Sequence, residues 1–415
     1  MKLATLAFRN VLRQRRRSVL TLLVLVAGYA AMALAGGFMA QTFGGLSESA
    51  IRGGLGHIQV QPQTAGSTLD DAGPGDFISG ADIVAARLQQ DPAVADVLPR
   101  IEFMGLASNG SRSVAFMGTA VDPERETRYM DIRDRLDGGA HAPGGAGSRW
   151  LKADPSAREV ILGTGLARSL GLSVGSSLTL MATTPSGALN AVDVDVVGLQ
   201  DQGVKELNDR ALCVSEATGA ALLDLGSSRS RLAVILRDPA RAASDARRLG
   251  NVAGPGCMGR PWFELASFYQ QVKLLYIAIF GFMGLVLGLV VLLATANTLL
   301  MSVMERLREL GTLRALGMQP GRLVALLQWE GALLGLAGSA GGLVLTLLIR
   351  AVLNALHLQM PAPPGSTHGY EMHINAVPLV YLVSFLGLQV VIQLSALAPG
   401  LKAARIRIVE ALRNV

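Results

Sequence analysis

Charged residues are scarce in this sequence, and their scarcity is the first constraint on what the protein can be. They make up 16% of the 415 residues, whereas hydrophobic residues make up 50%. A soluble globular domain usually carries charges on about a quarter of its residues. The composition therefore excludes an ordinary soluble enzyme and indicates a chain that buries much of its length in a membrane.

The residues that build common catalytic and nucleotide-binding motifs are also few. None of the five lysines follows a glycine, so the phosphate-binding loop GxxxxGK[ST] is absent. The five histidines form no HExxH metal motif, and the GTG that begins at Gly163 lacks the third glycine of a dinucleotide site. We therefore expect no catalytic residue and no metal site in this chain.

Only two cysteines occur, Cys213 and Cys257, and both lie in the same long polar segment. An oxidising compartment would allow a disulfide between them, but two free thiols fit the sequence equally well.

Four apolar runs are long enough to cross a bilayer, which takes roughly 20 residues of helix. They cover residues 18–39, 274–301, 323–348 and 377–397. The sequence therefore predicts four transmembrane α-helices in a one-plus-three arrangement, with a large extracytoplasmic α+β domain between helices 1 and 2. We place the boundaries at 1–39 for an interfacial helix and helix 1, 40–272 for the domain, and 273–415 for helices 2 to 4.

The N-terminal segment has a second interpretation, because a basic stretch, an apolar stretch and Ala33-Leu34-Ala35 together resemble a cleavable signal peptide. The apolar run of about 20 residues exceeds the usual 7 to 15 of such a signal. We expect a retained membrane anchor.

The positive charges predict the orientation. The segments before 18, between the second and third runs, and after 397 together hold fourteen basic residues and three acidic ones. Cytoplasmic flanks of membrane helices carry such an excess. We expect both termini and the 304–323 segment in the cytoplasm of a cell whose inner membrane holds the protein, and no binding to nucleic acid.

Within 40–272 the hydrophobic period changes repeatedly. Strand patterns occur at 56–62, 94–108 and 112–121, a helix pattern occurs at 81–91, and strand, short helix and strand follow at 158–182. Irregular loops are expected at 62–76 and 137–148, which are rich in glycine, proline and aspartate. The alternation predicts a mixed α+β domain with two lobes.

A charged stretch, MERLRELGTLRALGMQPGRL at 304–323, separates the second and third apolar runs. Leucine recurs there at every third position and forms one drifting apolar stripe. Gly317 suits a helix C-terminus and Pro320 prevents continuation, which predicts a short amphipathic helix over about 304–318. Its mixed charge favours a protein partner over lipid head groups alone. The residues expected at this contact are Glu305, Arg306, Leu307, Arg308, Glu309, Leu310, Gly311, Leu313, Arg314, Leu316 and Gly317.

Small residues recur along two of the apolar runs and predict close helix packing, since small side chains let helix backbones approach in a membrane. These residues are Gly284 and Gly288 in the second run and Gly331, Gly335, Gly338 and Gly342 in the third. Beside them, Glu330 is an acid in an apolar run. Such an acid either transmits motion or forms a structural hydrogen bond at the head-group level.

Several motifs resemble a known family in their order and spacing. Residues 303–342, VMERLRELGTLRALGMQPGRLVALLQWEGALLGLAGSAGG, are similar to the core of the FtsX-like permease domain of macrolide-exporter-type and lipoprotein-releasing ABC systems. LAFRNVLRQRRRSVLTLL at 6–23 and LAPGLKAARIRIVEALRNV at 397–415 resemble its two ends, although the tail lacks the usual proline before VEALR. VILGTGLARSLGLSVGSSLTL at 160–180 resembles the periplasmic core domain of that family.

The resemblance implies a mechanical role without catalysis in this chain. The 304–318 helix would be a coupling helix docked on a separate ABC ATPase subunit, which would bind ATP and magnesium. Further partners would be a second permease copy or paralogue, membrane lipids and a periplasmic lipoprotein carrier or adaptor protein. The complex would extract or export a lipoprotein, lipid or hydrophobic compound. The alternative is a non-transporting regulator of a cell-wall hydrolase.

Overall fold

The computed structural model describes residues 3–13, 15–64, 77–129, 136, 147–201, 205–360 and 370–405. The chain divides into two compact units. The helical unit comprises Met1–Gly44, Val272–Gln359 and Glu371–Val415, and the strand unit comprises Gly45–Gln271 and Met360–Tyr370.

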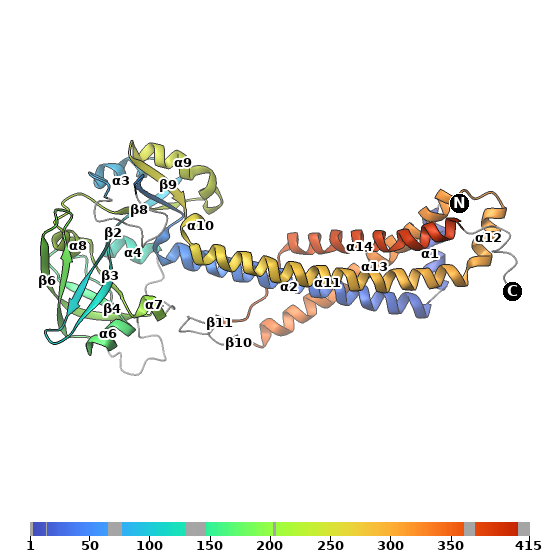
Figure 1. Cartoon of the computed structure of the whole chain (residues 1–415), viewed down its shortest axis with the longest axis horizontal. Helices are drawn as coiled ribbons and strands as arrows, with labels where there is room; N and C mark the ends of the chain where they lie inside the picture. Colours follow the sequence, from blue (N-terminus) through green and yellow to red (C-terminus); the bar gives the residue numbers. More distant parts are fainter. Residues whose placement is uncertain are drawn as a thin grey trace. The chain divides into compact units, whose positions relative to one another are not determined.

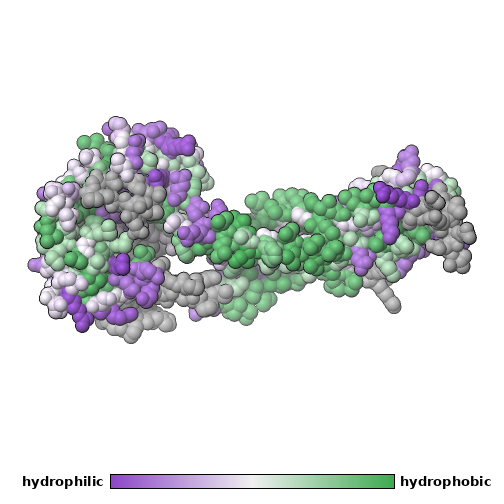
Figure 2. Space-filling model, viewed as in Figure 1, coloured by the Kyte–Doolittle hydropathy of each residue, from purple (hydrophilic) through white to green (hydrophobic). Residues whose placement is uncertain are grey.

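Four long helices form the helical unit (Figure 1). They are α2 (Arg15–Ala50), α11 (Ser267–Glu305), α13 (Pro320–Ala355) and α14 (Pro378–Arg405). Each contains a stretch long and apolar enough to cross a membrane, which confirms the four expected helices, and Figure 2 shows their hydrophobic surface. All four helices contribute to one buried core around Leu25, Val291, Leu334 and Leu388.

The helices extend beyond the apolar runs that predicted them. Hydropathy marks where a chain enters lipid, whereas a helix continues until a cap or a breaker ends it. Thus α2 continues past residue 39 to Ala50, through two glycines, and passes into the π-helix η1 (Ile51–Leu55). Two short helices, α1 (Leu3–Arg13) and α12 (Leu307–Ala315), lie at one end of the helical unit (Figure 1).

Gly331, Gly335, Gly338 and Gly342 form a glycine ridge along α13. This ridge packs closely against two neighbouring helices. A Cβ atom on Gly335 would lie 2.8 Å from Ile392 of α14, and one on Gly338 would lie 2.6 Å from the Cβ of Leu25 of α2. Gly331 also faces α14, and Gly342 also faces α2. The close packing predicted for the third apolar run is therefore present within a single chain.

The strand unit is built on one nine-stranded sheet in the order β3-β7-β4-β6-β5-β2-β8-β1-β9, in which β3 also pairs with β2. This extra pairing closes β2, β3, β7, β4, β6 and β5 into a ring. The strands are β1 (Ile58–Pro62), β2 (Val94–Ser108), β3 (Ser113–Val121), β4 (Glu159–Gly163), β5 (Ser177–Thr183), β6 (Leu189–Gln200), β7 (Ala211–Ser215), β8 (Arg231–Leu236) and β9 (Cys257–Pro261).

Two cores give the strand unit its two lobes. All six strands of the ring supply side chains to one core, together with α6 (Thr164–Leu170) and α8 (Glu216–Leu223). The other core lies between β1, β8 and the first part of β2 and the helices α3 (Ala81–Gln89) and α9 (Ala242–Ala253). The mixed α+β architecture predicted from the sequence is confirmed.

The remaining elements are short connections. They are α4 (Pro123–Tyr129), α7 (Lys205–Asn208), the 3-10 helix η3 (Pro239–Arg241), α10 (Trp262–Leu265) and the two-stranded sheet of β10 (Gln359–Met360) and β11 (Tyr370–Glu371). Most of the two loops expected at 62–76 and 137–148 lies outside the described residues. Cys213 and Cys257 form no disulfide with each other, which decides between the two possibilities that the sequence left open.

The close approach at Gly338 makes a testable prediction. In Gly338→Ala the new methyl group would overlap Leu25, and such overpacking typically costs about 1–3 kcal/mol. We expect a lower thermal unfolding midpoint for the purified full-length protein. Gly284→Ala is the matched control, because no described atom lies within 4 Å of a Cβ there. Equal midpoints for the two variants would contradict the packing described here.

Candidate functional site

The chain turns a corner between α11 and α13, and α12 forms that corner. Arg306 leaves the helical conformation, with φ −103° and ψ 17°, so α11 ends at Glu305 and α12 starts at Leu307. At the other end, Gly317 has a φ of +92°, Met318 N–H donates to Leu313 O, and Gly317 N–H donates to Arg314 O. These paired bonds are the Schellman ending of a helix.

The third helix of the corner begins immediately afterwards. Gln319 is extended, with ψ 145°, and Pro320 occupies the first turn of α13, where a missing N–H costs nothing. The end at Gly317 and the break before Pro320 agree with the prediction. The start differs by a few residues, because Met304 and Glu305 continue α11.

A charged cluster fixes the corner to two other helices. Glu330 of α13 is buried, and its Oε1 accepts hydrogen bonds from Asn10 Nδ2 of α1 at 2.6 Å and from Arg306 NH1 at 3.1 Å. Arg306 also pairs with Glu309 at 3.2 Å, and Arg13 of α1 reaches Glu309 at 2.9 Å. The buried carboxylate is therefore compensated by a guanidinium and an amide, as burial of a charge requires.

The apolar side of α12 packs on its own chain. Leu310 is buried against Val303 of α11, Leu323 and Leu327 of α13 and Ala403 of α14, and Leu313 is packed against the same cluster. The sequence predicts one drifting leucine stripe at the contact with a partner. The structure divides it, because the corner lays α12 across the ends of the long helices and covers the middle of the stripe.

The other side of α12 is exposed. Leu316 is 81% exposed, and Arg308 and Thr312 are also exposed. Arg314 is half-buried, and its NH1 donates to the backbone oxygen of Ala404 in α14 at 3.1 Å. The surface that remains for a partner therefore combines one apolar side chain with polar and basic ones.

The structure brings some predicted residues together and leaves others apart. Glu330 accepts a hydrogen bond from Arg306 at the corner. By contrast, a Cβ on Gly284 or Gly288 of α11 would have almost no described atom within 4 Å. Sequence reasoning did not single out Asn10 or Arg13. Asn10 did leave a signal, because it follows Leu6 and Ala7 by one helical turn and so places a polar group on the apolar face of α1.

One further motif in the sequence matches a catalytic pattern by letters alone. Residues 171–175, GLSVG, fit the GxSxG pattern of a nucleophile elbow, which lies between a strand and a following helix. Here the order is reversed, since the segment joins α6 to the following strand β5. The N–H of Ser173 donates to Ser176 Oγ within a turn. The segment is therefore a connecting turn.

Two family profiles match the chain in tandem. The profile of the MacB-like periplasmic core domain covers residues 18–252, and that of the FtsX-like permease C-terminal covers residues 274–408.

Individual proteins resemble the chain at lower identity. The lipoprotein-releasing system transmembrane protein LolC of Neisseria meningitidis serogroup B is 26% identical over 262 residues, which is 60% of this chain and 60% of that protein. LolC of Xylella fastidiosa is 27% identical over 341 residues, or 78% of each. The chain thus spans less than two thirds of the Neisseria protein. The solved periplasmic region of MacB from Actinobacillus actinomycetemcomitans aligns with a TM-score of 0.35 and 14% identity, over 54% of this chain and 95% of that structure.

The charged cluster predicts a local effect of removing Glu330. Loss of one partner from a buried ion pair typically costs about 3–5 kcal/mol, so Glu330→Ala should loosen the corner. We expect faster amide hydrogen exchange over residues 306–316 in the purified full-length protein. Arg13→Ala is the control, because its exposed pair with Glu309 contributes at most about 1 kcal/mol.

Replacement of both partners distinguishes the effect of the ion pair from a general loss of folding. In Arg306→Met with Glu330→Met no charge stays buried alone, and slow exchange should return. Rapid exchange in the double variant, or unchanged exchange in Glu330→Ala, would contradict the role given to this pair.

Proposed function

Because the chain belongs to the family of FtsX-like permeases with a MacB-like periplasmic core domain, we propose that α12 docks on a separate ATPase subunit. The chain is a permease of the ABC transporter type, and the partner subunit binds ATP and magnesium. The observation that carries the proposal is the geometry of the corner. One face of α12 is exposed, and its other face packs on the long helices.

The contacts of α12 with its own chain allow a force on α12 to be transmitted to the long helices. Leu310 packs α12 onto α13, Arg306 joins it to Glu330, and Arg314 joins it to α14. From Glu305 the helix α11 runs without a break to Ser267, a length of about 58 Å for its 39 residues. Movement of the ATPase would thereby displace helices that continue directly into the strand unit.

The substrate is proposed from the family and from the relatives. Both curated relatives are named as parts of lipoprotein-releasing systems. We propose that this chain acts on a lipoprotein, lipid or hydrophobic compound at the outer face of the cytoplasmic membrane, with the strand unit outside. A second permease completes the assembly, and the open side of α11 around Gly284 offers it a place to pack.

Docking of the ATPase predicts that the exposed Leu316, at the C-terminal end of α12, is an important contact. Leu316→Asp places a charge on the exposed apolar contact, and loss of such a contact typically costs 2 kcal/mol or more, which is about 30-fold in affinity. We expect the purified complex to lose its ATPase while the permease inserts normally. Arg308→Ala, at the edge of the surface, should cost less than about 1 kcal/mol. A stoichiometric ATPase in the Leu316→Asp complex would count against docking at α12.

The orientation is tested by labelling single cysteines in a chain whose Cys213 and Cys257 are replaced by alanine. Ser186 lies in an exposed turn of the strand unit, and Thr312 lies on the exposed side of α12. A membrane-impermeant maleimide should label Ser186→Cys on intact spheroplasts and Thr312→Cys only after permeabilisation, because basic flanks stay in the cytoplasm. The reverse pattern would overturn the proposed orientation.

A further inference from the structure

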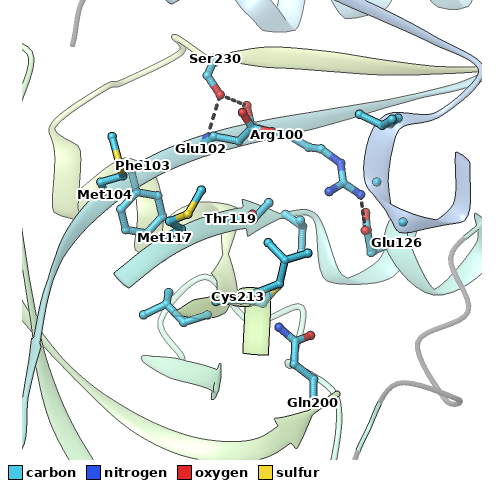
Figure 3. Close-up of a pocket in the computed structure, with 18 of the residues that line it drawn as sticks. Arg100, Glu102, Phe103, Met104, Met117, Thr119, Glu126, Gln200, Cys213 and Ser230 are labelled. Atoms are coloured by element: carbon cyan, nitrogen blue, oxygen red, sulfur yellow. Dashed lines mark hydrogen bonds and ion pairs between the residues drawn. The ribbon is translucent and has the colours of Figure 1, made fainter. Parts of the chain in front are cut away.

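The strand unit contains a cavity of about 650 Å³ next to strands β2 and β3 of the ring (Figure 3). Pockets for small molecules usually measure roughly 300–1,000 Å³. Along β2 the side chains of Glu102 and Met104 line the cavity, and so does Phe103, which also packs in the core of the ring with Ile101.

One wall of the cavity is apolar and adaptable. Met104 of β2 and Met117 of β3 lie directly opposite each other in the antiparallel register, and Met104 is 59% exposed. Leu265 and Phe268 extend the apolar lining. Methionine side chains are flexible and polarisable, which suits contact with apolar chains of irregular shape.

Next to these methionines, the lining also carries charges that already balance one another. Arg100 pairs with Glu126, both buried, and Arg231 pairs with Glu102 at 2.8 Å. Burial raises the pKa of the Glu102 carboxyl, while the nearby Arg231 and Arg100 oppose that change. Ser230 Oγ accepts from the Glu102 N–H and donates to Arg100 O (Figure 3). Among the described lining residues, an ionic ligand would find no unpaired charge of opposite sign.

Two hydrogen-bond donors of the lining residues remain unused. Gln200 is 5% exposed and its Nε2 has no partner among the described residues, and the same holds for Nε of Arg100, which is 6% exposed. The Gln200 amide points toward Cys213 and the middle of the cavity in Figure 3. A buried donor without a partner is costly, so acceptor oxygens of a ligand would stabilise both.

We propose that this cavity binds a single-chain amphiphile with an uncharged head group that offers acceptor oxygens, as an ester or amide does. The head group accepts from Gln200 Nε2 at the end of β6, and the apolar chain lies over Met104 and Met117. This inference goes beyond the proposed coupling to an ATPase and does not depend on it, since binding needs no ATP.

The experiment uses the full-length protein in lipid nanodiscs and a monoacylglycerol that carries a photoreactive diazirine in its acyl chain. After illumination, we expect cross-linked peptides from β2, β3 or the segment around Phe268. A tenfold excess of unlabelled monoacylglycerol should reduce this labelling about tenfold. The fatty acid and the alkyltrimethylammonium of equal chain length should each reduce it less than twofold. Labelling confined to the apolar runs at 18–39, 274–301, 323–348 and 377–397 would overturn the proposal.

Two variants test the apolar contact and the head-group contact separately. Met117→Trp fills the apolar side and should lower the labelling at least fivefold, whereas Leu189→Trp, at an exposed position outside the lining, should leave it unchanged. Gln200→Leu keeps a similar side-chain volume and removes the unused donor. It should abolish the preference for monoacylglycerol over a plain alkyl diazirine while labelling by the alkyl probe persists. An unchanged preference in Gln200→Leu would overturn the assignment of the head-group contact, whatever the folding of Met117→Trp.

Discussion

The buried ion pair between Arg306 and Glu330 is the interaction on which the arrangement of the corner depends. A lone carboxylate in the packed end of α13 would be strongly unfavourable, and the guanidinium of Arg306 offsets that cost only from a position outside the regular helix. The break between α11 and α12 supplies this position. Because Asn10 binds the same carboxylate oxygen, the pair also fixes α1. The packing of Leu310 follows, since the corner directs α12 across the ends of α13 and α14.

Strand β2 has a comparable role in the strand unit. Residues 94–100 pair with β8 of one lobe, residues 105–108 pair with β5 of the ring, and β3 accompanies the strand from residue 100 onward. Between these partners, the N–H of Glu102 is satisfied by the side chain of Ser230. Arg100 lies at this transition and packs over Gly54 of η1, where a Cβ would approach its NH1 to 2.6 Å. The start of the strand unit is therefore in direct contact with the strand that joins its two lobes.

Local signals in the sequence predicted local structure well, but they could not predict contacts between residues that lie far apart in the sequence. Gly317 ends one helix and Pro320 starts the next where expected, because helix caps depend on a few neighbouring residues. The pairing of Asn10 with Glu330 spans 320 positions, and the closure of the ring through β2 and β3 depends on strand pairings that periodicity does not specify. The leucine stripe of α12 misled for the same reason, since a hydrophobic period shows that a face is apolar but not which neighbour covers it.

The position of Glu330 directly before the glycine ridge links the charged cluster to the packing of the whole helical unit. Gly331 and Gly335 hold α13 against α14, and Gly338 holds it against α2 at a distance that leaves no room for a Cβ. Helices in such close contact move together, because sliding would drive side chains into backbone. In the coupling proposed above, a displacement of α12 that acts on Glu330 would be transmitted from α13 to α14 and α2 through these contacts. By contrast, the glycine at 284 in α11 meets no described atom within 4 Å. The face of α11 that carries Gly284 is therefore open to a further helix, whereas Val291 and Leu299 pack that helix into the shared core.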